Sequence, residues 1–98
     1  MRTGDTRVAD MRNLGEKSSE WLLEIGVSKR SQIEAIGSVE IYRRLRQVGI
    51  PASLNLVYAL EASILDIDWR ELAPEAKVDL KQQIADLNLG KFKKYGKE

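Results

Sequence analysis

The sequence predicts an all-α fold in which five short helices pack in a compact, orthogonal arrangement. Apolar residues recur at helical spacing along most of the chain, and no segment alternates apolar and polar residues as a half-buried strand does. Gly26, Gly37 and Gly49 each close a helical stretch, and glycine is the preferred residue just after a helix end. Short connections marked by glycine favour helices that cross steeply over a long parallel bundle.

A short helical turn is expected ahead of the first full helix. Val8, Met11 and Leu14 recur at every third residue, which places three apolar side chains on one side of a turn. We place the start of the domain at residue 11 and expect residues 1–10 to form a flexible N-terminal segment.

The first full helix is expected over residues 16–25. Its apolar face is formed by Trp21, Leu22 and Ile25. Gly26 is expected to end the helix, with Val27 folding back onto Leu22, as in a Schellman-type helix end.

The second helix is expected over residues 30–36, with two possible caps. Ser28 stands just before this helix, whereas Ser31 has a glutamate three residues later, which is the spacing of a capping box. Both alternatives place Ile33 and Ile36 on the inner face of the helix.

The third helix is expected over residues 39–48, with Ser38 as its cap. Its predicted apolar stripe is Val39, Tyr42, Leu45 and Val48. Residues 45–50 repeat the pattern L-x-x-[I/V]-G-[V/I] of residues 22–27. Two independent helix ends of the same type explain this echo better than a duplication, because one short repeat does not define a repeat architecture.

Residues 54–67 are the most apolar stretch and are expected to form the central, most buried helix. Trp69 and Leu72 are expected to fold back over the core. Pro74 suits the first turn of a last helix, expected over residues 74–89. The core contacts expected from this last helix are Val78, Ile84 and Leu87. The domain is thus expected over residues 11–89, followed by a basic tail at residues 90–98.

Composition argues against an enzyme. The chain has no histidine and no cysteine, which removes the commonest general base and the usual zinc ligands. Asp66, Asp68 and Glu71 lack the glycine and final glutamate of a calcium loop, so we expect a polar loop and neither metal nor cofactor. No apolar run reaches the length of a membrane span or forms a secretory signal, and we expect a cytoplasmic protein.

The net charge is only +1 and is unevenly distributed. Residues 51–90 carry three Lys/Arg against seven Asp/Glu, whereas residues 90–98 carry four Lys against one Glu. A protein held to DNA mainly through counterion release is usually more basic than this. The balance therefore permits local phosphate contacts and does not favour strong autonomous DNA binding. A solvated tail is favoured over a tail that binds nucleic acid through lysine and aromatic side chains.

The turn that opens the first full helix is the principal candidate site. Gly15, Glu16, Lys17 and Ser18 would present first-turn amides, two side-chain donors and the positive end of the helix dipole to a phosphate group. The carboxylate of Glu16 weakens this hypothesis. Plain helix capping is the favoured alternative.

A second glycine-marked turn is a weaker candidate. Gly37 and Ser38 open the third helix, and Arg43 and Arg44 follow within two helical turns. These four residues could contact DNA phosphates, although a capped helix junction with solvated arginines is the commoner arrangement.

Several motifs occur in one unbroken order through residues 11–80. They are residues 12–18 with Trp21 and Leu22, residues 25–27, 36–45 and 53–62, and Trp69. In this order they resemble the C-terminal domain of the TfoX/Sxy family of bacterial competence regulators. The turn at residues 13–18 also resembles, more locally, the N-L-G-x-K-S turn that contacts DNA phosphates in the C-terminal domain of the RNA polymerase α subunit.

This resemblance implies a helix-hairpin-helix-like domain, similar in arrangement to SAM domains and to the α-subunit domain. It also implies a regulatory role, since some full-length relatives act with a cyclic-AMP receptor protein in activating competence genes. Those relatives carry an N-terminal domain that this sequence lacks, so we expect a stand-alone C-terminal domain. The resulting hypothesis is a non-enzymatic transcription or competence regulator that contacts duplex DNA weakly or binds a transcription regulator protein. The alternative is a protein-interaction domain without nucleic-acid contact.

Overall fold

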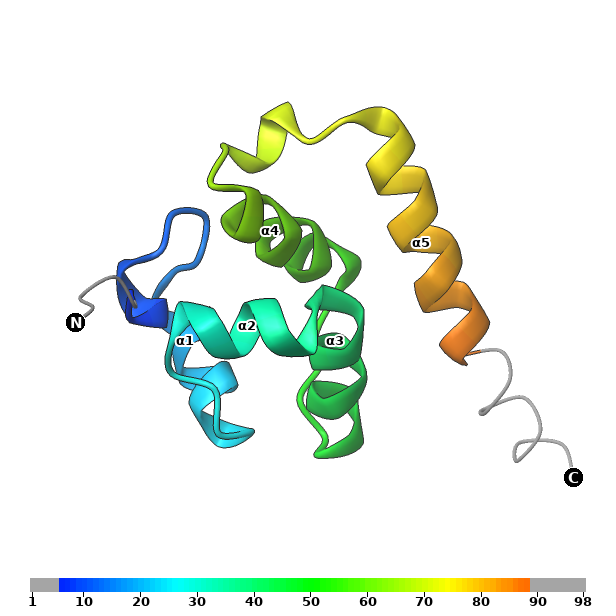
Figure 1. Ribbon diagram of the computed structural model, residues 1–98. Helices are drawn as coiled ribbons and strands as arrows, with labels where there is room; N and C mark the ends of the chain where they lie inside the picture. The colour runs from blue at the N-terminus through cyan, green and yellow to red at the C-terminus, as the bar shows by residue number, and fades with distance from the viewer. Residues whose placement is uncertain (1–5, 89–98) are drawn as a thin grey trace, which may run out of the picture.

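The computed structural model describes residues 6–88, which form an all-α structure (Figure 1). The elements are the 3-10 turn η1 (Val8–Asp10), α1 (Glu16–Glu24), α2 (Arg30–Ile36), α3 (Ser38–Gln47), α4 (Leu54–Leu65), the 3-10 turn η2 (Trp69–Glu71) and α5 (Pro74–Asn88). The all-α prediction is confirmed, and the helix-hairpin-helix-like arrangement stays a prediction. No helix within residues 6–88 is long and apolar enough to cross a membrane.

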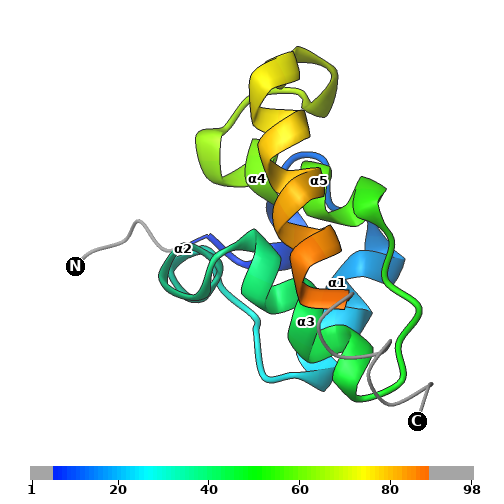
Figure 2. The same ribbon diagram turned by 90° about the vertical axis from the view of Figure 1, so that its right-hand side faces the viewer.

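Helix α4 is the centre of the packing. Its side chains Val57, Leu60 and Ala62 are fully buried, and α2, α3, η2 and α5 all pack on it. Figures 1 and 2 show α5 lying against α3 and α4, and in Figure 1 α1 lies at the opposite side of the molecule. The predicted central helix is therefore confirmed, although it ends at Leu65, before the left-handed residue Asp66.

The C-terminal end of α4 accepts hydrogen bonds from segments that are distant in the sequence. A helix leaves its last carbonyls without intrahelical partners. Arg30, at the start of α2, donates to the carbonyls of Ser63 and Ile64, and Arg12 donates to the carbonyl of Asp66 at 3.2 Å. The negative end of the helix dipole favours these two cations. Arg12 and Arg30 thus stabilise the folded structure.

Helices α1 and α3 end in the same way, as their shared sequence pattern predicts. The amide of Val27 donates to the carbonyl of Leu22 at 2.9 Å, and the amide of Ile50 donates to the carbonyl of Leu45 at 3.0 Å. The glycine inside each turn has a positive φ, +80° after α1 and +90° after α3. Only glycine adopts such angles readily, which explains why both helices stop there.

The cap of α2 differs from both predicted alternatives. The residue before the first turn is Lys29, so neither Ser28 nor Ser31 occupies the cap position. The side-chain oxygen of Gln32 accepts from the amides of Ser28 at 2.8 Å and Lys29 at 3.0 Å. A side chain from inside the first turn therefore satisfies the free amides at this helix start.

Some apolar residues do not join the core as predicted. Val48, just after α3, and Val78 on α5 are 60% and 68% exposed, whereas Ile41 and Leu80 are buried. Ile84 is buried, as predicted. Helix α5 packs through the face of Leu80 and Ile84. Residues two positions apart lie on nearly opposite sides of a helix, which leaves Val78 in solvent.

The packed domain begins before the predicted boundary at residue 11. Val8 is buried, and its amide donates to the carbonyl of Ser28 at 2.8 Å. The amide of Arg30 donates to the carbonyl of Thr6 at 2.7 Å. Residues 6–10, expected in the flexible segment, therefore belong to the fold, while residues 1–5 and the predicted tail at 90–98 lie outside the described residues.

Candidate nucleic-acid interface

Helix α1 begins with three successive amides that meet no acceptor in the described chain. Gly15 stands before the first turn in an extended conformation. The hydroxyl of Ser19 turns back and donates to the Gly15 carbonyl at 3.0 Å. The amides of Glu16, Lys17 and Ser18 have no hydrogen-bond acceptor among residues 6–88. Free amides at the positive end of a helix dipole favour an anion at this point.

A cleft of about 370 Å³ opens beside this turn. It lies between the start of α1, the start of α4 and η2. We call it the tryptophan cleft, because both tryptophans of the chain line it. Its lining residues are Asn13, Lys17, Ser18, Trp21, Ser53, Asn55, Leu56, Ala59 and Trp69.

One lysine lines the tryptophan cleft, and a second lysine lies over one of its rings. The ammonium of Lys17 lies 5.9 Å from the centre of the Trp21 ring, and the ammonium of Lys77 lies 5.7 Å from the centre of the Trp69 ring. Both distances are within the range of cation–π attraction. Among residues 6–88 no carboxylate lines the cleft, and Glu16, although exposed in the same turn, is not one of the lining residues.

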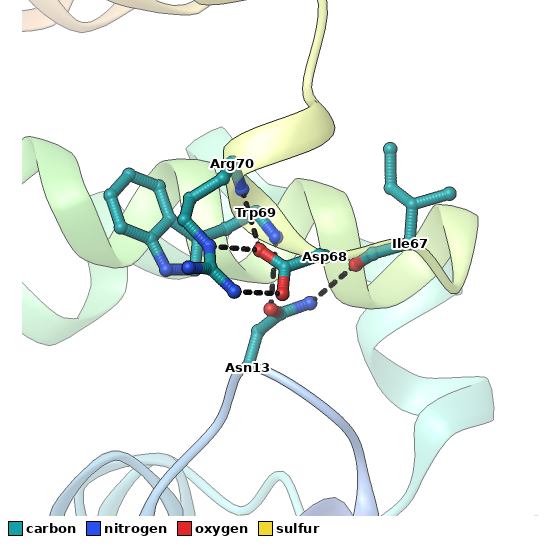
Figure 3. Close-up of polar contacts among 5 residues, drawn as sticks. All are labelled: Asn13, Ile67, Asp68, Trp69 and Arg70. Carbon is teal, nitrogen blue, oxygen red and sulfur yellow. Dashed lines mark hydrogen bonds and ion pairs between the residues drawn. The ribbon is translucent and has the colours of Figure 1, made fainter.

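Asn13 connects the two sides of the cleft (Figure 3). Its side-chain amide donates to the carbonyl of Ile67 at 2.7 Å, and its side-chain oxygen accepts from the amide of Trp69 at 3.0 Å. Its backbone is left-handed, with a φ of +74°, a conformation that asparagine tolerates better than most residues. Asn13 thereby holds Trp69 in place relative to the start of α1.

Replacing Asn13 by alanine should lower the free energy of unfolding by about 2 kcal/mol, because two hydrogen bonds are lost and alanine is strained at positive φ. Asn13→Gly is the matched control, since glycine keeps the backbone conformation and loses only the side-chain bonds. Urea unfolding of both variants measures the difference. Equal stability of wild type and both variants would show that this clamp does not hold the two segments together.

The segment after α4 turns Trp69 outward. Leu72 is buried, as predicted, whereas Trp69, which we expect from the sequence to fold back over the core, is 44% exposed and does not join the core cluster. The guanidinium of Arg70 donates to both oxygens of Asp68 at 2.9 Å (Figure 3). These bonds hold the pKa of the Asp68 carboxyl well below its usual range.

The second predicted turn faces a different and acidic cleft. Ser38 is the first residue of α3, not its cap, and its hydroxyl donates to the carboxylate of Glu61 at 2.9 Å. A cleft of about 440 Å³ lies beside it, between α3, α4 and α5. We call it the acidic cleft; its lining residues are Ile36, Gly37, Ser38, Val39, Glu40, Glu61, Ala76, Asp79, Leu80 and Gln83. Of the residues that the structure describes, three carboxylates and no cation line this cleft, which disfavours a phosphate there.

Arg43 and Arg44 are both paired with one carboxylate. Arg43 donates to both oxygens of Glu40, at 2.9 and 2.7 Å, and Arg44 donates at 2.9 Å. The bonds from Arg43 and then Arg44 lower the pKa of Glu40 to about 2. The carboxylate offsets part of the positive charge that these arginines would offer to DNA.

The two predicted groups of site residues therefore lie apart. Residues 15–18 sit beside the tryptophan cleft, and residues 37–38 sit beside the acidic cleft. Sequence reasoning missed the contribution of Ser53, Asn55 and Trp69, which only the tertiary fold brings to α1. It also missed the pairing of Glu40, although the spacing of three and four residues to the arginines is a recognised signal of ion pairs on a helix.

Comparison with known proteins relates the chain to one family and to two solved structures. The family model described as the TfoX C-terminal domain matches residues 4–84. A crystal structure of an uncharacterized protein from Listeria monocytogenes (triclinic form) is 23% identical, with a TM-score of 0.78 over 85% of this chain and 94% of that chain. A second one, of a protein of unknown function from the same organism (tetragonal form), is 24% identical, with a TM-score of 0.76 over 82% and 98%. These two likenesses concern the fold alone. No curated protein matches the chain.

Proposed function

The chain belongs to the TfoX C-terminal domain family, and we propose that it is a non-enzymatic regulatory domain that holds the phosphate backbone of duplex DNA at the start of α1. Membership of this family points to a regulatory, competence-related domain. The DNA contact is the step that we add. It is assigned to the turn of Gly15, Glu16, Lys17 and Ser18.

The observation that carries the proposal is the set of free amides at this turn. Glu16, Lys17 and Ser18 present successive N–H groups without acceptors in the described chain, and Lys17 adds an exposed cationic side chain to the same turn. A phosphate oxygen placed there accepts from the backbone and is attracted by one full and one partial positive charge. The adjoining tryptophan cleft adds no carboxylate from residues 6–88 that would repel it.

Such a contact positions the domain on DNA without reading the base sequence. Phosphate contacts carry no direct sequence information, and a net charge of +1 gives little long-range attraction. We therefore propose weak, sequence-independent binding in which specificity comes from a partner in the transcription complex.

One observation favours the alternative function, a protein-interaction domain without nucleic-acid contact. The acidic cleft gathers Glu40, Glu61 and Asp79 at the junction of α3 and α5. A basic segment of a protein partner would fit this negative charge better than a phosphate does.

Fluorescence anisotropy of a labelled DNA duplex tests the leading proposal. Release of counterions from one or two phosphates should weaken binding about 3- to 12-fold between about 50 and 200 mM salt. The same titration with Gly15→Pro tests whether the turn takes part in binding, because proline changes the backbone conformation just before the free amides. Binding that does not respond to salt, or no binding at the lower salt concentration, would leave the protein-interaction alternative as the better account.

A further inference from the structure

The tryptophan cleft is larger than a single phosphate contact requires. Its volume of about 370 Å³ lies within the range of small-molecule sites, roughly 300–1,000 Å³. The rings of Trp21 and Trp69 line it together with the apolar side chains of Leu56 and Ala59. This combination offers aromatic surface to a flat, ligand-sized group.

Two helices begin at this cleft, which concentrates hydrogen-bond donors around it. Besides α1, helix α4 starts here, and Ser53 before its first turn makes no side-chain cap bond. The amides of Leu54 and Asn55 find no acceptor among residues 6–88. The exposed side chain of Asn55 lines the cleft. Backbone amides, a hydroxyl and a carboxamide therefore stand next to the aromatic rings.

The charges of the cleft suit an anionic ligand. Lys17 lies over Trp21, and Lys77 lies over both Trp69 and Tyr58, at 5.7 and 5.8 Å from the ring centres. Within the described part of the chain, the lining contains a lysine and no acid, whereas the acidic cleft has three carboxylates and no cation. A negatively charged, aromatic ligand is complementary to the first cleft and not to the second.

We propose that the tryptophan cleft binds one unpaired nucleotide of a single-stranded nucleic acid. Its base stacks on Trp69 and Trp21, and its phosphate lies at the start of α1 beside Lys17. In a duplex the faces of the bases are covered by their neighbours, whereas in a single strand they are free to stack on aromatic side chains. The proposal rests on the phosphate contact of the proposed function and extends it from the backbone to the base.

Intrinsic tryptophan fluorescence reports directly on this site, because the only two tryptophans of the chain both line the cleft. Titration with an oligothymidylate should quench the emission, and an oligouridylate of the same length shows whether DNA or RNA is preferred. Quenching by either strand supports the proposal. A duplex that binds while both strands leave emission and anisotropy unchanged would overturn the nucleotide site and leave the duplex contact intact.

Variants at Trp69 locate the binding. Trp69→Ala should weaken binding of a labelled strand by about 5- to 150-fold, the range for loss of one base–aromatic stack. Trp69→Phe should restore most of the affinity because it keeps an aromatic face. Leu65→Ala, at a residue that is exposed and outside the cleft lining, is the matched control.

Thermal unfolding of each variant separates binding from folding, and Trp69 is exposed enough for alanine to leave the domain folded. A folded Trp69→Ala variant that binds the strand as tightly as the wild type would overturn the proposal, because the strand would then lie elsewhere. Absence of both single-strand and duplex binding would overturn this inference together with the proposed function.

Discussion

Leu60→Ala should destabilise the domain by about 4 kcal/mol, near the upper part of the range for buried leucines. Leu60 has no exposed surface and lies in α4, on which α2, α3, η2 and α5 all pack. Removing its side chain leaves a cavity that these neighbours cannot fill without moving together. Because domains of this size are stable by only about 5–10 kcal/mol, a large part of the variant should be unfolded at moderate urea concentration.

Urea denaturation followed by circular dichroism measures this loss. Leu23→Ala is the matched control, because Leu23 is a helical leucine that is 60% exposed. Its effect should stay within about 0.5 kcal/mol, as for surface substitutions. Similar effects of the two substitutions would contradict the assignment of α4 as the centre of the core.

Lys17→Glu should weaken duplex binding about tenfold or more and should lower the slope of the salt dependence by about 1, as expected for one lost phosphate contact. The substitution replaces a cationic side chain in the first turn of α1 by a carboxylate. The melting temperature should change little, because Lys17 is exposed and its contact with the Trp21 ring is a weak surface interaction.

Lys81→Glu is the control for net charge. It makes the same change at an exposed position of α5 that lines neither cleft. Anisotropy measurements should show a much smaller loss of affinity for this variant. Equal losses would mean that overall charge, and not the start of α1, governs binding. A large fall in the melting temperature of Lys17→Glu would instead make the turn a structural element.

The helices could be predicted because their signals are local. Apolar residues at a spacing of three and four, and a glycine followed by an apolar residue, placed the ends of α1 and α3, and the bonds from Val27 to Leu22 and from Ile50 to Leu45 confirm them. Periodicity does not decide which face of a helix is buried when both faces carry apolar residues. Val78 was therefore assigned to the core, although α5 packs through Leu80.

The surroundings of the candidate site could be predicted only in part, because they depend on contacts between distant residues. The turn at Gly15 was identified from its neighbours in sequence. Asn13, however, is held by Ile67 and Trp69, more than fifty positions away, and no local pattern indicates these bonds. Trp69, whose backbone amide donates to Asn13, forms one wall of the tryptophan cleft.

The contact of the α1 start with DNA phosphates is tested most directly by an NMR titration of the wild-type domain with a DNA duplex. The account predicts that the largest amide shifts occur at Glu16, Lys17 and Ser18 and that they diminish as the salt concentration rises. Shifts centred on the acidic cleft, or no shifts at low salt, would contradict it.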